Sequence, residues 1–367
     1  MGEPIRVLHV VTYMGRGGLE TMIMNYYRHI DRSKVQFDFL THRDEKWDYD
    51  DEIESLGGRI YHLPRLNPFS PKYLKSLDDF FRDHKEYDIV HCHQDCLSGI
   101  VLKYAKKNGV PFTIAHSHNA NQDKNLKYLI KLAAKRNITK YADYLFACGK
   151  EAGRWMFNTD DFTILNNAID TESYIYDKEK SLKKYKLSGN RLICVFFGGG
   201  GNGSTTSLPY IKRLIKNNLN LDIIFIAGKN EKSQERVNKY IEEYHATNIR
   251  VIGYATNVPE LLQLCDFVIS KPGGAQSTEC LYFNKPILMI NSSGGQEVAN
   301  YKYFTKNGYG RRFRTSWGLN NFVKDIVNNP KILTKMQKNM AKNHNEQAIQ
   351  KLYELTKDLL KNNKSNN

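Results

Sequence analysis

The clearest chemical pattern in the chain is a glycine turn placed between an apolar run and a helical pattern. The apolar run is Phe267–Ile269, the turn is Lys271-Pro272-Gly273-Gly274, and the helix start carries Gln276, Ser277 and Glu279. Free backbone N–H groups at such a turn suit a diphosphate. A carboxylate one turn inside the helix, at Glu279, suits two vicinal hydroxyls such as those of a ribose. The pattern predicts a nucleotide site.

A second polar group follows at Gly294-Gly295-Gln296-Glu297, with Asn300 one turn further on. The amide of Gln296 and the carboxylate of Glu297 are groups that can bind sugar hydroxyls. Taken with the glycine turn, these residues predict a site for a nucleotide sugar.

Two further glycine loops follow predicted strands. Gly17 and Gly18 open the first helix and would let the backbone approach a phosphate or a sugar, although an ordinary tight turn fits equally. Glu20 is a catalytic candidate, or a helix-start carboxylate that complements the helix dipole. The second loop, Gly198-Gly199-Gly200-Gly201-Asn202-Gly203, contains GxGxxG.

A dinucleotide site needs an acidic residue about 20 residues after such a loop, at the end of the next strand. That strand ends in Ile226-Ala227-Gly228-Lys229, without an acid. We therefore expect phosphate or sugar contact in place of NAD, with a flexible glycine loop as the alternative.

Histidines gather in two short segments, His91-Cys92-His93 and His116-Ser117-His118. Alternation puts His91 and His93 on one strand face and Cys92 on the other, and no structural zinc spacing is matched. We predict that the acidic run Asp48–Asp51 lies at the surface, exposed to solvent, and binds no metal. We therefore predict no metal. His116 and His118 end a strand and are candidates to accept a hydroxyl proton, the alternative being hydrogen-bonded structural histidines.

Strand and helix patterns alternate along the whole chain, which predicts parallel, doubly wound sheets and an α/β fold. The predicted strands are Ile5–Val11, Val35–Leu40, Arg59–Leu63, Ile89–His91, Phe112–His116, Tyr144–Ala147, Thr163–Leu165, Leu192–Phe197, Leu221–Ala227, Ile249–Ile252, Phe267–Ser270 and Ile287–Ile290. A lysine-rich stretch separates two domains, 1–190 and 191–345. We expect a helix and a polar tail over 346–367. Ligands should bind at the carboxyl ends of the strands, in a cleft.

The 367 residues include no apolar run long enough to cross a bilayer and no signal-peptide pattern, and the six cysteines are scattered. These features predict a cytoplasmic protein with reduced thiols. Residues 1–190 carry 29 Lys and Arg against 26 Asp and Glu, and residues 191–367 carry 25 against 13. Basic surfaces favour anionic partners, although nucleic-acid motifs are absent. The basic amphipathic pattern Leu126–Tyr141 predicts core packing, or contact with an anionic membrane surface.

Residues 4–190 resemble family-4 glycosyltransferases of the exopolysaccharide and capsule type. The resemblance rests on Arg6–Val11, Gly15–Thr21, Ile114–Asn119 and Leu165–Asp170. It implies the acceptor-binding half of a GT-B fold, in which two doubly wound Rossmann-like domains face a central cleft. It also implies that His116 lies where members of the family contact a sugar.

Residues 191–360 instead resemble family-28 enzymes, namely diacylglycerol glycosyltransferases and the lipid-linked muramoyl-peptide N-acetylglucosaminyltransferase. The carrying residues are Gly198–Gly203, Tyr254, Ala255, Ser270–Gly274, Glu279, Gly295–Glu297 and Asn300. The resemblance implies that Tyr254, Ala255 and Val258 border a uracil, that Glu279 holds the ribose and that the glycine turns hold the diphosphate. It assigns Gln296 and Glu297 to the sugar.

Neither family's catalytic set is complete in this chain. The resemblance to family 28 implies a histidine base in the first glycine loop, where Leu19 stands, and the resemblance to family 4 implies a glutamate where Lys271 stands. The chain is a natural mosaic or an engineered fusion. We expect transfer of a sugar from UDP to a glycan or lipid-linked acceptor, with Lys271 replacing a metal. The alternatives are a diacylglycerol glycosyltransferase, a nucleotide-sugar-binding protein with little activity, and a UDP-sugar epimerase.

Overall fold

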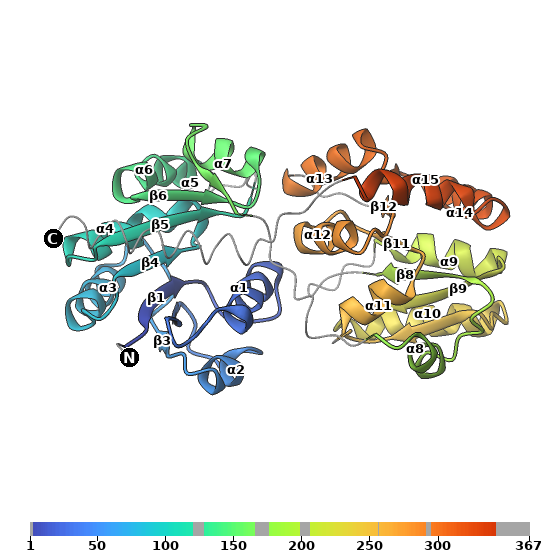
Figure 1. Ribbon diagram of the computed structural model, residues 1–367, viewed down its shortest axis with the longest axis horizontal. Helices are drawn as coiled ribbons and strands as arrows, with labels where there is room; N and C mark the ends of the chain where they lie inside the picture. Colours follow the sequence, from blue (N-terminus) through green and yellow to red (C-terminus); the bar gives the residue numbers. More distant parts are fainter. Residues whose placement is uncertain are drawn as a thin grey trace. The chain divides into compact units, whose positions relative to one another are not determined.

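The computed structural model describes residues 3–119, 128–165, 176–198, 206–255, 257–290 and 295–342, apart from the side chains of residues 295 and 296. The chain divides into two compact units. The first contains the described residues up to 165, and the second contains those from 176. Figure 1 shows that each unit has its own sheet with helices on both faces.

The first unit is built on a parallel sheet of seven strands in the order β3-β2-β1-β4-β5-β6-β7. The strands are β1 (Ile5–Val10), β2 (Val35–Thr41), β3 (Ile60–His62), β4 (Ile89–Cys92), β5 (Phe112–Ser117), β6 (Tyr144–Ala147) and β7 (Thr163–Ile164). The order reverses between β1 and β4, because the chain first builds toward β3 and then crosses to the other side. The carboxyl ends of β1 and β4 are therefore the place where a ligand is expected in this unit.

Two apolar layers cover the two faces of this sheet. One is formed with α3 (Pro71–Asp83), α4 (Ser98–Lys107), α6 (Ile138–Tyr141) and α7 (Lys150–Phe157), and the other with α1 (Gly18–His29) and α2 (Asp50–Ser55). The remaining helical segments are η1 (Asp95–Leu97) and α5 (Tyr128–Lys135). Cys92 packs into the first layer, so His91 and His93 face the second. This confirms the predicted alternation.

The second unit is built on a parallel sheet of six strands in the order β10-β9-β8-β11-β12-β13. The strands are β8 (Leu192–Phe197), β9 (Leu221–Ile226), β10 (Ile249–Ile252), β11 (Phe267–Ser270), β12 (Ile287–Ile290) and β13 (Gly310–Phe313). The reversal of order lies between β8 and β11. Both glycine loops that the sequence analysis assigned to this domain follow these two strands.

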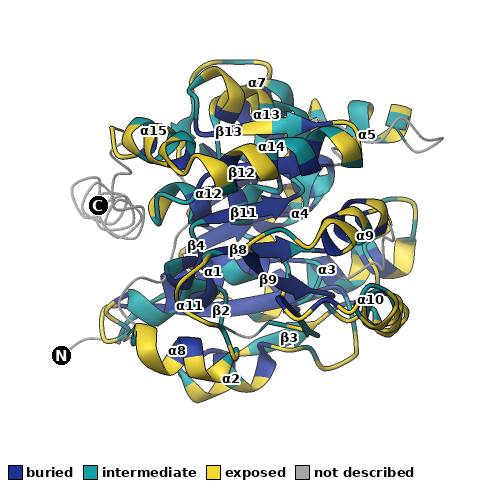
Figure 2. Ribbon diagram, turned by 90° about the vertical axis from the view of Figure 1, so that its right-hand side faces the viewer, coloured by how far each residue is buried: buried dark blue, intermediate teal, exposed yellow. Residues whose placement is uncertain are grey.

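Helices again cover both faces. One layer is formed with α9 (Leu208–Asn217), α10 (Glu231–Glu243), α14 (Ser316–Asn328) and α15 (Lys331–Met340), and the other with α8 (Lys178–Lys184), α11 (Val258–Leu264), α12 (Gly274–Tyr282) and α13 (Gly295–Lys306). In Figure 2 the strands β8, β9 and β11 are buried, and the outer surfaces of α9 and α10 are exposed. Parallel strands buried on both faces explain the continuous apolar runs of the sequence.

The α/β fold with two doubly wound sheets confirms the predicted fold class, and every predicted strand is present. One strand, β13, was not predicted from the sequence. This edge strand reads Gly-Arg-Arg-Phe, and only Gly310 and Phe313 are buried. Residues 176–190, which we assigned to the first domain, group with the second unit because Ser181 and Lys184 of α8 contact the Glu260 carboxylate of α11 at 2.9 and 2.6 Å. The predicted C-terminal helix and tail lie outside the described residues.

Candidate functional site

The second unit brings most of the predicted binding residues to one edge of its sheet. Tyr254 follows β10, Gly198 follows β8 and Lys271 follows β11. All strands of this sheet are parallel, so their carboxyl ends meet at the same edge. The edge includes the reversal point between β8 and β11, where open α/β sheets bind ligands.

The glycine turn after β11 leads directly into α12. Gly273 is the N-cap of this helix, and no side chain caps its first N–H groups. The Ser270 hydroxyl donates to the Lys271 carbonyl at 2.8 Å and to the Gln276 side-chain oxygen, which fixes the turn. The Gln276 amide nitrogen and the Ser277 hydroxyl are buried without a partner among the described residues. The turn thus presents backbone and side-chain hydrogen-bonding groups for an anion.

Gly198 and Gly273, both predicted to bind the donor, are glycines for two different physical reasons. A Cβ at Gly198 would lie 2.3 Å from Cζ of Phe225, so glycine is needed there for the packing of β8 on β9. A Cβ at Gly273 would meet nothing within 4 Å. The space beside Gly273 is therefore open to a ligand, whereas Gly198 is explained by the fold. Gly199, Gly200 and Gly201 lie outside the described residues.

Glu279 lies on α12, half-buried, within two turns of Gly273. Burial raises the pKa of its carboxyl group to about 7. An ordinary surface glutamate is fully ionised at neutral pH, whereas Glu279 is divided between its charged and neutral forms. A carboxylate held in this way gains most from a ligand that donates hydrogen bonds, such as a pair of hydroxyl groups.

The start of α13 is tied to the same turn. The Asn300 side-chain amide donates to the Pro272 carbonyl at 2.8 Å, so the second turn of α13 is held against the turn that precedes α12. Glu297 lies one turn before Asn300 on this helix. The Gln296 side chain lies outside the described residues.

At the other end of the edge, Tyr254 is 43% exposed, and Ala255 and Val258 pack against the apolar layer beneath it. The Lys229 ammonium lies 5.6 Å from the centre of the Tyr254 ring. Lys229 was not among the predicted binding residues. The sequence carries a signal for it, since a glycine and a lysine, Gly228 and Lys229, follow shortly after β9, and the structure gives Gly228 a positive φ.

Gly17, Gly18 and Glu20 lie on the first unit, at the start of α1. Gly17 is the N-cap of α1, and a Cβ there would lie 2.2 Å from a Glu20 carboxylate oxygen. The buried Glu20 carboxylate therefore folds back onto the start of its own helix and accepts from its own N–H. This geometry favours the capping interpretation of Glu20.

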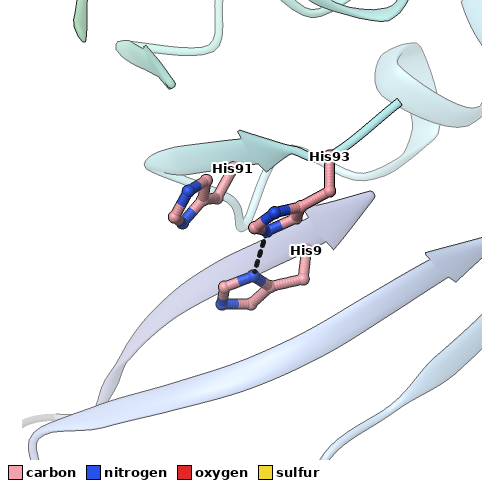
Figure 3. A group of neighbouring side chains, drawn as sticks. All are labelled: His9, His91 and His93. Atoms are coloured by element: carbon pink, nitrogen blue, oxygen red, sulfur yellow. Dashed lines mark hydrogen bonds between the residues drawn. The ribbon is translucent and has the colours of Figure 1, made fainter. Parts of the chain in front are cut away.

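His116 and His118 belong to a cluster of five imidazoles with His9, His91 and His93, part of which Figure 3 shows. His116 is 2% exposed, and its Nδ1 lies 3.1 Å from Nε2 of His91. Burial lowers the pKa of each ring, to about 3 for His118, so all five are neutral at pH 7. Neutral rings can accept protons, but Nε2 of His116 is enclosed.

The structure corrects two predictions about surface segments, one for the run Asp48–Asp51 and one for α5. Asp50 is buried and accepts from the Trp47 N–H at 2.9 Å, so it helps fix the start of α2 and is not part of a solvated run. In α5 no residue is buried, and Leu129 and Ile130 are exposed, so the expected core packing of this stripe is wrong for these two residues. Leu126 lies outside the described residues. Within the described ranges, every helix is too short or too polar to cross a bilayer.

Comparison with known proteins assigns the two halves to two families. Residues 16–173 match the model for Glycosyltransferase Family 4, and residues 193–353 match that for the Glycosyltransferase family 28 C-terminal domain. The chain is a GT-B glycosyltransferase. The two matches confirm the two resemblances seen in the sequence.

This glycosyltransferase is 37% identical to EpsF of Bacillus subtilis (strain 168) over 202 residues, which span only about half (52%) of that relative. It is 25% identical to the processive diacylglycerol beta-glucosyltransferase of Bacillus pumilus (strain SAFR-032), covering 84% of this chain and 78% of that protein. The structure of Anabaena Alr3699/HepE with UDP and glucose superposes with a TM-score of 0.69 at 14% identity, covering 97% of this chain and 99% of that one. That likeness establishes the fold.

Proposed function

We propose that this glycosyltransferase uses a UDP-sugar donor bound to the second unit. The observation that carries the proposal is Glu279, a carboxyl group with a pKa of about 7 on the same helix that begins at Gly273, beside which there is open space. In the proposal Glu279 accepts from the ribose hydroxyls, and the start of α12 with Lys271 holds the diphosphate. Tyr254, Ala255 and Val258 border the uracil, and Glu297, Gln296 and Asn300 bind the sugar.

We place the acceptor, a glycan or a lipid-linked glycan, on the first unit. The positive end of α12 and the Lys271 ammonium would offset the charge that develops on the departing diphosphate. For activation of the acceptor hydroxyl we propose the histidine cluster that contains His116 and His118. The resemblance to the diacylglycerol beta-glucosyltransferase supports a lipid acceptor as the second candidate.

The function is tested by measuring UDP release from UDP-glucose, UDP-galactose and UDP-N-acetylglucosamine, with and without glycan and diacylglycerol acceptors. We expect one donor to be preferred and UDP release to require an acceptor. Conversion of the donor sugar without any acceptor would replace the proposal by a UDP-sugar epimerase. UDP binding without turnover on either acceptor class would replace it by a binding protein.

Contact with an anionic membrane surface is a further part of the proposal. Leu129 and Ile130 are exposed on α5, and Lys131 lies on the same helix. An exposed apolar pair beside lysine suits the boundary of an anionic bilayer. We expect the protein to float with phosphatidylglycerol liposomes at low salt. Replacing both Leu129 and Ile130 by serine should abolish flotation, and flotation that persists in this variant would exclude α5 as the contact.

A further inference from the structure

The histidine cluster of the first unit has a connectivity that ordinary core packing does not explain. Nδ1 of His9 lies 3.1 Å from Nε2 of His93, and Nδ1 of His93 lies 2.9 Å from Nε2 of His118. Nε2 of His91 lies 3.1 Å from Nδ1 of His116. Among the described residues, Nε2 of His116 and Nε2 of His9 are buried without a partner. Buried polar atoms without partners are costly and require a reason.

The contacts divide the cluster into an outer group and a supporting pair. His93, His116 and His118 can each offer a nitrogen, and these nitrogens lie within 4.8 Å of one another. Nδ1 of His116 is occupied by His91, which leaves its orphaned Nε2. Nε2 of His93 is occupied by His9, as Figure 3 shows, so its Nδ1 faces the outer group, 2.9 Å from Nε2 of His118. The second nitrogen of a metal-binding histidine is usually held by such a hydrogen bond.

We propose that His93, His116 and His118 bind one divalent transition-metal ion, with Zn²⁺ as the natural occupant, and that His9 and His91 orient the ligands. The spacing of one nitrogen pair fits, and the third nitrogen lies within 4.8 Å of both. Two nitrogens bound to one tetrahedral Zn²⁺ at about 2.0–2.1 Å lie roughly 3.3 Å apart, close to the 2.9 Å between His93 and His118. An ion also supplies the partner that Nε2 of His116 otherwise lacks.

The ligand chemistry selects the class of ion. Imidazole nitrogen suits Zn²⁺, Ni²⁺ and Cu²⁺, whereas Mg²⁺ and Ca²⁺ prefer oxygen. Three neutral ligands leave the charge of the ion uncompensated, so its fourth position favours an oxygen ligand such as hydroxide. His118 is only partly buried, so the outer group lies near the surface of the first unit. No linear zinc spacing predicted this site, because its ligands come from the carboxyl ends of two separate strands.

The test uses the full chain, purified without a polyhistidine tag and freed of metal with a chelator. Co²⁺ is titrated as the spectroscopic probe, and Zn²⁺ retained after dialysis is measured by elemental analysis. We expect one equivalent of either ion per chain, with the visible absorption bands of tetrahedral Co²⁺. His116→Ala and His93→Ala should each weaken binding by at least 100-fold. His9→Phe, which keeps an aromatic ring against Phe37, should weaken it about 10- to 100-fold.

The matched control is His84→Ala, which removes a histidine of the same unit that contacts Glu86 outside the cluster. It should bind Co²⁺ as the wild type does. Circular dichroism shows whether each variant is folded, and the wild-type titration needs no variant at all. Wild-type protein that binds no Co²⁺ overturns the proposal, and so does equal binding by folded His116→Ala. A bound ion would occupy nitrogens of His116 and His118, so this proposal replaces proton acceptance by these two rings whenever the ion is bound. The measurement does not involve donor turnover, so its outcome is independent of the proposed donor site on the second unit.

Discussion

Replacing Glu279 by glutamine is expected to weaken binding of a UDP-sugar while making the protein more stable above neutral pH. Loss of charge-assisted hydrogen bonds to two hydroxyls should reduce affinity by about 10- to 100-fold, which corresponds to about 1.4–2.8 kcal/mol. Wild-type affinity should rise from pH 6 to pH 8, because the carboxyl group, with a pKa of about 7, must ionise to accept both bonds. The glutamine variant should lose this dependence. Calorimetric titration with UDP-glucose measures both effects.

The gain in stability follows from the same pKa. The folded-state value of about 7 lies above the ordinary 4.5, so the stabilising contribution of neutral Glu279 is complete below pH 4.5 and is lost as the pH rises through 7. The variant should therefore match the wild type at pH 4.5 and exceed it by about 1–3 kcal/mol at pH 8. Thermal unfolding at the two pH values tests this.

The control is Glu242→Gln, an exposed position on α10 of the same unit. It should change neither affinity nor stability. If Glu279→Gln binds UDP-glucose as tightly as the wild type, Glu279 does not contact the ribose. Opposite effects on affinity and stability are the signature of a residue retained for binding at the expense of the fold.

Replacing Gly273 by alanine should weaken UDP-sugar binding by about tenfold or more and leave the protein folded. The added methyl group meets no protein atom within 4 Å and enters the space that we assign to the diphosphate. The backbone of Gly273, with φ −67° and ψ 152°, is open to alanine, and the weaker N-cap costs only about 1 kcal/mol. Thermal unfolding and donor titration separate the two effects.

The matched substitution is Gly198→Ala. Its methyl group would lie 2.3 Å from Phe225, so this variant should lose stability by about 1–3 kcal/mol or more. The pair therefore distinguishes a glycine needed by a ligand from one needed by the fold. Normal donor affinity in Gly273→Ala would remove the diphosphate from this turn.

The sequence predicted the strands of both sheets because continuous apolar runs mark parallel strands buried on both faces. It missed β13, where Gly310 is required because a Cβ there would lie 2.1 Å from the Ile287 carbonyl oxygen, and where two arginines hide the strand pattern. It also assigned α8 to the wrong side of the domain boundary, because the bonds from Ser181 and Lys184 to Glu260 join residues distant in sequence.

Only those residues of the candidate site that are contiguous in sequence could be predicted. The glycine turn and Glu279 are contiguous, so local spacing indicates them. The sequence does not show that Gly198 is required by packing whereas Gly273 is not. That difference depends on Phe225, which lies on a neighbouring strand beside Gly198. The five-histidine cluster is likewise assembled from β1, β4 and β5 and the residues that directly follow two of them. The register between β1 and β4 brings His9 opposite His91. Sequence patterns do not give this register.

The apolar layers described above also bear on how such a chain can arise. Each of the four buried clusters draws its described members from one unit only. Within the described residues, these four clusters would therefore stay intact if a gene segment for one unit were joined to a segment for the other. Recombination near the boundary could in this way join a first unit of one lineage to a second unit of another, as the matches of the two halves to two different families would require.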